Sequence, residues 1–333
     1  MSDTPTQSKS ILVTGGAGAI GSTVVRRLSK NNLVVVVDNL SSGSRSNIAD
    51  VPCELVVADI RDNEKVASIF NANSFDVVIH LAAHFANQNS VDFPTSDLSV
   101  NIQGTLNVLE QCRHKKPRLI YASSSCVYGK RSGPMKEDLP IDDLHTPYAI
   151  SKYSAEKYCE FYANHYGFEA ISLRFFNSYG PYDPPGPYRN VIPNFIVKAL
   201  NGDELCITGT GEETRDFNYC QNTVDAVCRT ADHIFSDQYL YRVFNVGTGH
   251  ETKIIDLAQR IVWLTGDKSK ITICGKRRDW DKTMNRCADI SKITTELNYV
   301  PRITLDEGLP KTIEWIKDNW SQVTNRFGIK TAA

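Results

Sequence analysis

A tyrosine and a lysine four residues apart could carry out acid–base chemistry in this chain. Tyr148 begins the segment YAISK, Lys152 ends it, and Pro147 precedes it where a helix could start. Side chains four apart on a helix are neighbours. A phenol has an ordinary pKa of about 10, and a nearby ammonium favours the phenolate. We therefore expect Lys152 to lower the pKa of Tyr148, which would then act as a general base.

A run of hydroxyl side chains, SSSCVYG, begins at Ser123, directly after a predicted strand at residues 118–122. In parallel α/β sheets, ligands bind at the carboxyl ends of the strands. Ser124 is therefore a candidate to hold a substrate oxygen beside the tyrosine. The Tyr-Lys spacing recurs at residues 153 and 157, so spacing alone is not specific.

A glycine-rich turn, TGGAGAIG, follows the first predicted strand and precedes a predicted helix. Gly15 permits a tight turn, Gly18 lets the backbone approach a pyrophosphate, and Gly21 permits close packing of helix on strand. Asp38 ends the second predicted strand, where a carboxylate accepts hydrogen bonds from a ribose and repels a 2′-phosphate. The pattern predicts a dinucleotide site for NAD rather than NADP, and Asp59 is a candidate for the adenine amino group.

Short β-branched runs alternate with amphipathic stretches in the first half of the chain, which indicates a doubly wound parallel sheet of the Rossmann type. The predicted strands cover residues 10–14, 33–37, 54–57, 77–80 and 118–122, and helical spacing covers residues 20–29 and 98–112. The segment PYDPPGP, residues 181–187, is too rich in proline for a helix or a central strand. We expect a Rossmann domain at residues 9–178 and a smaller α/β substrate-binding lobe at residues 179–320, with possible recrossing of the chain.

Composition excludes several classes of function. The 333 residues carry a formal net charge of −1, which predicts no nucleic-acid or membrane partner. The first residues lack a signal-peptide pattern, so a cytoplasmic location is expected. Nine cysteines occur without metal-ligand spacing; we interpret them as free thiols and expect no metal site.

Six motifs occur in the order of the extended short-chain dehydrogenase/reductase family: TGGAGAIG, HLAA at residues 80–83, NIQGT at residues 101–105, SSSCVYG, YAISK and RFFN at residues 174–177. The chain resembles the branch of NAD-dependent nucleotide-sugar epimerases and dehydratases. The resemblance implies that Ser124, Tyr148 and Lys152 are catalytic, with Cys126 as a further candidate. The implied cofactor contacts are Gly15, Gly18, Ala19, Ile20, Asp38, Asn39, Asp59, Ile60, Leu81, Ala82, Ala83, Asn101, Tyr148 and Lys152. The implied nucleotide-sugar contacts are Ser124, Ser125, Asn177, Asn190, Val191, Arg215 and Arg278.

The net reaction depends on the step that comes after oxidation of the sugar. Dehydratases and decarboxylases of this branch carry T-D-E or T-S-E at the positions that match 124–126. This chain has Cys126 in the place of the glutamate. A 4-epimerase needs no such acid, so UDP-hexose 4-epimerisation through a 4-keto sugar is the expected activity. Three alternatives stay open: a GDP- or UDP-sugar 4-dehydrogenase, a 3,5-epimerase using Cys126, and a dinucleotide-binding protein without catalysis. Tyr182 stands where uronate-processing relatives often carry an arginine, which argues against a carboxylate on the sugar, although Arg286 could compensate for the missing arginine.

The resemblance also implies a homodimer. Relatives usually pair through the helix that carries the YxxxK segment and through the helix around residues 98–112, in a symmetric contact.

Overall fold

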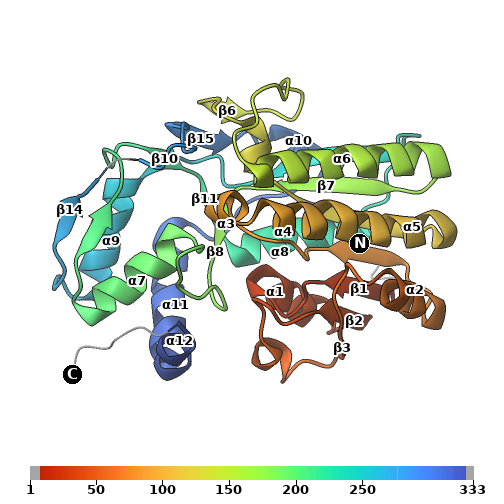
Figure 1. The fold of residues 1–333 in the computed structure, drawn as a ribbon, viewed down its shortest axis with the longest axis horizontal. Coiled ribbons are helices and arrows are strands. Elements are labelled where there is room, and N and C mark those ends of the chain that lie inside the picture. The colour runs from red at the N-terminus through yellow and green to blue at the C-terminus, as the bar shows by residue number, and fades with distance from the viewer. Residues whose placement is uncertain (1–7, 276, 328–333) are drawn as a thin grey trace.

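The computed structural model describes residues 8–275 and 277–327. Figure 1 shows a large lobe, built on a sheet with helices on both faces, beside a smaller lobe. Seven parallel strands form the large sheet in the order β12-β7-β5-β4-β1-β2-β3. Their bounds are β1 Ser10–Thr14, β2 Leu33–Asp38, β3 Glu54–Val57, β4 Val77–His80, β5 Arg118–Ser124, β7 Ala170–Phe175 and β12 Tyr241–Val246. The predicted Rossmann fold is confirmed; β2 and β5 run one and two residues beyond their predicted ends.

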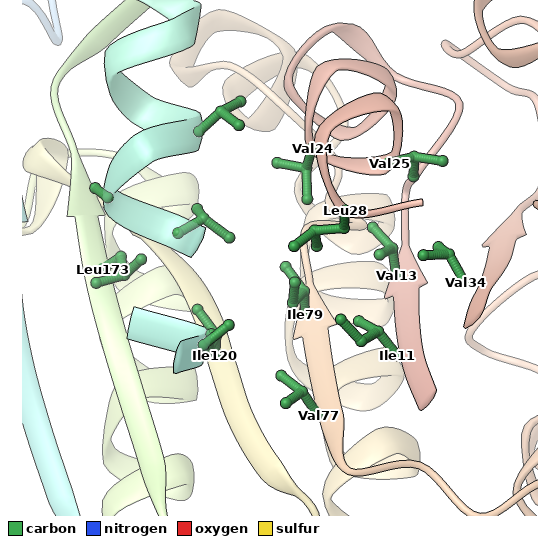
Figure 2. Close-up of a cluster of buried hydrophobic side chains, with 14 of the residues drawn as sticks. Ile11, Val13, Val24, Val25, Leu28, Val34, Val77, Ile79, Ile120 and Leu173 are labelled. Carbon is green, nitrogen blue, oxygen red and sulfur yellow. The ribbon is translucent and has the colours of Figure 1, made fainter. Parts of the chain in front are cut away.

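Alternate residues of the central strands enter two separate hydrophobic cores, one on each face of the sheet. Ile11 and Val13 of β1 join the core beneath α1 and α8, whereas Leu12 joins the core beneath α2, α5 and α6. This alternation follows from the period of two in a strand. Figure 2 shows the first core, where side chains of β1, β2, β4, β5 and β7 meet those of α1.

The helix predicted at residues 20–29 is present within one residue as α1, whereas the stretch predicted at residues 98–112 differs. The helices are α1 Ala19–Leu28, α2 Asn63–Ala72, α3 Asn87–Asp92, α4 Pro94–Leu98, α5 Thr105–Lys115, α6 Pro147–Tyr166, α8 Cys220–Asp232 and α10 Ser291–Leu297. The stretch predicted as one helix at residues 98–112 is instead divided, because a π-helical segment at Ser99–Gly104 separates α4 from α5. Two short 3₁₀ turns complete this lobe, at Arg45–Ile48 and Ser125–Tyr128.

The smaller lobe is built from short strands and four helices around a core of its own. Its helices are α7 Val191–Asn201, α9 Ile254–Thr265, α11 Leu305–Asp318 and α12 Trp320–Phe327. Its strands are β6 Pro134–Met135, β8 Asn177–Tyr179, β9 Leu205–Ile207, β10 Thr214–Arg215, β11 Phe217–Tyr219, β13 Thr252–Lys253, β14 Ile271–Ile273 and β15 Asn285–Ala288. They form a four-stranded sheet, β13-β10-β15-β6, and the pairs β11-β8 and β14-β9.

The chain returns to the large lobe after it has entered the smaller one. Helix α8 packs against α1, and β12 pairs in parallel with β7 along six residues at one edge of the large sheet. The loop at residues 181–187 contains neither helix nor strand, as its prolines predict.

Two cysteines correct the expectation that all nine are free thiols. Cys206 and Cys274 form a disulfide with a Cα–Cα distance of 5.5 Å, whereas the other seven are free. Strands β9 and β14 pair in parallel, and this pairing brings residues 68 apart in the chain together. Sequence spacing carried no signal of the contact.

Among the described residues, no helix has the length and apolar character needed to cross a bilayer. No cluster of potential metal ligands occurs in that part of the chain either.

Candidate active site

One cavity of about 850 Å³ lies between the large sheet and the smaller lobe. It is lined by the carboxyl ends of β1, β2, β4 and β5, by the start of α6, and by residues of the smaller lobe. This is the edge at which doubly wound sheets bind ligands. Of the predicted site residues, all line the cavity except Asn101.

The glycine-rich turn forms a close-packed cradle at one end of the cavity. Gly15 adopts a φ of +71°, and a Cβ added there would lie 2.7 Å from the backbone nitrogen of Ala82. A Cβ at Gly21 would lie 2.1 Å from the carbonyl oxygen of Gly15. Gly18 is the N-cap of α1, and no side chain of the described residues makes a capping hydrogen bond there. The turn can therefore bring backbone N–H groups to a phosphate.

Asp38 is held at the end of β2 by backbone donors. Its carboxylate accepts hydrogen bonds from the nitrogens of Ala17 at 2.9 Å and Leu40 at 2.8 Å. The side chain lines the cavity while only 7% of the residue is exposed. Its position suits a carboxylate that meets ribose hydroxyls.

Asp59 is already engaged by its neighbours at the end of β3. Arg61 forms an ion pair with it at 2.7 Å, and the Asn39 side chain donates to it at 2.9 Å. The guanidinium of Arg61 holds the pKa of the Asp59 carboxyl well below its usual range. Asp59 and Asn39 nevertheless line the cavity beside Ile60.

Tyr148 lies in the first turn of α6, where the local sequence fixes its position. Thr146 caps the helix by accepting from the nitrogen of Ala149, and Pro147 occupies the first helical position. The backbone nitrogen of Tyr148 donates to Ser90 Oγ of α3 at 3.0 Å. The hydroxyl of Ser124, which ends β5, lies near enough to the phenol to oppose the rise in the pKa of Tyr148. The predicted tyrosine–serine pair is thus brought together.

The electrostatic expectation for Tyr148 was wrong in direction. Burial raises the pKa of Tyr148 well above its ordinary value, with further contributions from Cys126 and Asp97. Lys152 donates to the carbonyl oxygen of Ala122 at 2.8 Å, and its ammonium lies 5.9 Å from the centre of the Tyr148 ring. Burial lowers the pKa of Lys152 to about 8. Because both groups are desolvated, loss of hydration outweighs their attraction in the protein alone.

Asn101 does not face the cavity. It is buried in the π-helical segment, where its side-chain oxygen accepts from the nitrogen of His84 at 2.8 Å. Its nitrogen donates to Asp97 at 2.8 Å and to Ser151 at 3.2 Å. Asn101 therefore ties α4 to α6 and to the loop after β4, rather than presenting its side chain to a ligand.

Ser124 and Ser125 lie at the end of β5 in the large lobe, whereas the other predicted nucleotide-sugar residues lie on the smaller-lobe side of the cavity. Asn177 donates to the carbonyl oxygen of Asp216, and Asn190 donates to that of Ser178, both at 3.2 Å. Arg215 pairs with Asp281 at 3.3 Å. Arg278 and Val191 complete this side of the cavity.

The geometry adds residues that the motifs did not assign. The indole of Trp280 donates to Gln88 of α3 at 2.9 Å, which links the two lobes across the cavity. His145 and Arg286 also line the cavity, and Arg286 lies near Cys126. The sequence suggested Arg286 only as a compensation for the missing arginine, and it gave no signal for His145. Pairing of β15 in the small sheet brings Arg286 to this place.

Comparison with known proteins agrees with this geometry. The model of the NAD dependent epimerase/dehydratase family matches residues 11–247. The chain belongs to this family. Its cofactor is NAD, and relatives of known structure are NAD complexes. The glycine cradle, the uncapped start of α1 and Asp38 fit that dinucleotide.

Two curated relatives show the range of chemistry within the family. The chain is 37% identical over 313 residues to a putative UDP-glucose 4-epimerase of Methanocaldococcus jannaschii, covering 93% of this chain and 99% of the relative. It is 32% identical over 323 residues to a UDP-N-acetyl-alpha-D-glucosaminuronate decarboxylase of Bacillus cytotoxicus, covering 93% and 98%. The protein is therefore an enzyme of the NAD-dependent nucleotide-sugar epimerase/dehydratase family.

The fold agrees with a solved family member. An epimerase of Methanothermobacter thermautotrophicus superposes with a TM-score of 0.90 at 39% identity, covering 96% of this chain and 95% of that one.

Proposed function

We propose that this family member is a nucleotide-sugar 4-epimerase, with a UDP-hexose as the sugar nucleotide. The proposal rests on one observation: Ser124, Tyr148 and Lys152 line one cavity, and position 126 holds a buried cysteine. Dehydratases of this branch carry a glutamate at the matching position. These residues suffice for oxidation and re-reduction at a single carbon, and epimerisation requires nothing more.

Each residue then has a defined task. NAD held on the glycine cradle and by Asp38 would supply hydride transfer from and to the sugar, and its positively charged nicotinamide would favour the phenolate. Tyr148 takes the proton of the C4 hydroxyl and gives it back to the ketone oxygen. Ser124 hydrogen-bonds the same oxygen, and Lys152 orients the cofactor. The 4-keto sugar must turn over before the hydride returns, and the cavity of about 850 Å³ provides space for that rotation.

Cys126 is less suited to proton exchange at carbons 3 and 5. Its sulfur lies 2.7 Å from Ser124 Oγ, and only 8% of the residue is exposed. Burial raises the pKa of its thiol, although Arg286 and the hydrogen bond to Ser124 oppose this. A raised pKa disfavours the thiolate that such exchange requires.

Incubation with single nucleotide sugars tests the proposal. UDP-glucose, UDP-galactose, and their N-acetyl and uronate forms are each supplied with NAD, and products are separated by anion-exchange chromatography. We expect interconversion of C4 epimers without net NADH. Stoichiometric NADH would instead identify a dehydrogenase, and deuterium from solvent at carbon 3 or 5 would identify the Cys126 route.

Replacement of Tyr148 by phenylalanine separates catalysis from binding. Removing the phenolic oxygen should lower kcat by roughly 100-fold or more, since general acid–base catalysis contributes about 10²–10⁴. NAD binding, measured by fluorescence titration, should stay within about twofold. Tyr153→Phe on the same helix is the matched control and should retain wild-type kcat. Undiminished turnover by Tyr148→Phe would remove the tyrosine from the mechanism.

We also propose that the enzyme is a homodimer through α5 and α6. The supporting observation is a set of exposed apolar side chains on or beside these helices, namely Leu98, Ile150, Tyr158 and Phe161.

A further inference from the structure

Arg286 projects from β15 onto the turn that carries the catalytic serine. Its Nη2 donates to the carbonyl oxygen of Gly129 and, at 2.7 Å, to Thr283 Oγ1. Gly129 directly follows the 3₁₀ turn after Ser124, and its nitrogen donates to the carbonyl oxygen of Cys126 at 3.0 Å. The guanidinium is therefore fixed at the sugar-oxidising end of the cavity rather than at the glycine cradle.

This guanidinium has no carboxylate partner among the described residues, unlike two other arginines of the cavity. Arg215 pairs with Asp281, and Arg277 pairs with Asp281 at 3.1 Å. The Nε–H of Arg286 is buried and donates to no acceptor in the same part of the chain. Burial without a paired anion lowers the pKa of Arg286 to about 10. A cation in this state gains most from an anionic ligand.

His145 supplies a second unsatisfied nitrogen beside the same turn. Its Nε2 is buried without a partner, while its Nδ1 lies 3.4 Å from Asp143. Gly129 packs closely against this loop: a Cβ added at Gly129 would lie 2.0 Å from the backbone carbonyl oxygen of Asp143. Burial lowers the pKa of His145. An anion placed here favours the protonated imidazole, which then donates from Nε2.

We propose that Arg286, assisted by His145, binds a carboxylate on the sugar, so that the preferred substrates are nucleotide-linked hexuronates. The inference deepens the proposed 4-epimerase function and rests on it for the placement of C4 at Tyr148. In a hexuronate the carboxylate is carried on C5, the carbon next to C4. It therefore reaches the turn after Ser124 when the C4 hydroxyl meets Tyr148. The similarity to a decarboxylase that is named for a nucleotide-linked uronate supports recognition of a sugar carboxylate.

The pyrophosphate of the nucleotide is the other anion that could meet Arg286. A pyrophosphate contact would serve every nucleotide sugar equally, whereas a carboxylate contact serves only uronates. The ratio of kcat/KM for UDP-glucuronate to that for UDP-glucose therefore distinguishes the two sources.

The experiment measures this ratio in the full-length protein and in Arg286→Met. We expect the wild-type ratio to exceed about 10, because a charge-assisted hydrogen bond contributes roughly 10- to 100-fold in binding. In Arg286→Met the ratio should fall by roughly 30-fold or more. Arg131→Met is the matched control, since Arg131 lies two residues beyond Gly129, outside the cavity, and pairs with the exposed Asp142. It should leave the ratio unchanged.

Two further variants keep the test decisive if Arg286→Met does not fold. Arg286→Lys retains a charge without the Nε–H donor and should lower the ratio less. His145→Asn should lower it by a smaller factor than loss of the guanidinium. A wild-type ratio below 1, or an equal loss for both substrates in the Arg286 variants, would overturn the proposal.

Binding measurements separate failure of this inference from failure of the proposed function. Calorimetry of the NAD-loaded protein with UDP-glucuronate and UDP-glucose does not require turnover. Tighter binding of UDP-glucuronate that depends on Arg286, without epimerisation of either sugar, would reject the 4-epimerase and retain the carboxylate site. Equal affinities would reject the carboxylate site whatever the reaction.

Discussion

Asp183 is buried in the proline-rich loop over the cavity. Only 5% of the residue is exposed, and its polar contacts include the Asn190 side chain at 3.4 Å. Burial raises its pKa to about 6, although the positive charge of Arg189 opposes this. The folded protein therefore holds a proton on Asp183 more tightly than the unfolded chain does.

This raised pKa sets the sign of a pH effect on stability. The contribution of Asp183 is fully present below the unfolded pKa of about 4 and is lost as the pH rises through 6. Asp183→Asn should therefore match the wild type at pH 4 and exceed it above pH 7 by up to about 3 kcal/mol, at about 1.4 kcal/mol per pKa unit. Urea unfolding at a series of pH values measures the difference.

The matched control for Asp183 is Asp142→Asn, at an exposed carboxylate paired with Arg131. Its effect on stability should change little between pH 4 and 7. If the free energies of unfolding of Asp183→Asn and the wild type also differed by the same amount at every pH, the raised pKa would not belong to Asp183.

A buried ion pair joins α6 to β7 behind the catalytic turn. Both oxygens of Glu156 accept from Arg174, at 3.0 and 2.9 Å, and the carboxylate also accepts from Ser123. The remaining guanidinium nitrogen of Arg174, Nη1, donates to the Tyr128 hydroxyl at 3.0 Å. The two elements that carry the tyrosine and the serine are thus held in register by one charged network.

Loss of one partner should leave the other charge buried and unpaired. Glu156→Ala is expected to lower the free energy of unfolding by about 3–5 kcal/mol. Glu160→Ala, one turn further along α6, removes an exposed pair with Lys157 and should change it by less than about 1 kcal/mol. Chemical denaturation measures the free energy of unfolding of the two variants. Equal losses would show that the buried pair stabilises the fold no more than the exposed pair.

Local patterns predicted the elements that depend on local signals. The five strands and α6 follow from β-branched runs and from Pro147 at the helix start, and the cradle follows from its glycines. Three features depend on tertiary contacts and were not predictable. Strand β12 is defined by its pairing with β7, the hydrogen bond from Arg286 to Gly129 depends on the small sheet, and the raised pKa of Tyr148 results from burial. The π-helical segment likewise interrupts a stretch whose apolar spacing looks continuous.

At the scale of the whole molecule, one face of α6 carries three exposed large apolar side chains. Ile150, Tyr158 and Phe161 are 47%, 40% and 53% exposed, and their spacing places them on one side of the helix. A symmetric pairing of this face with its copy would cover them.

We expect light scattering to give twice the chain mass of 37.2 kDa. Phe161→Glu should shift the protein toward monomer, because a dimer would bury two unpaired carboxylates. Trp263→Glu is the control, since Trp263 is 69% exposed on α9 of the other lobe. A monomeric wild type, or equal behaviour of the two variants, would rule out this interface.

The late arrival of β12 has a consequence for how the protein is made. A nascent chain that has emerged only as far as residue 178 has β7 at the border of its sheet, with the partner strand still unsynthesised. An unpaired border strand is a template for pairing with other chains. Truncation at residue 178 should therefore yield aggregates rather than an independent dinucleotide-binding module, and the ribosome must add about 70 more residues before that border is closed.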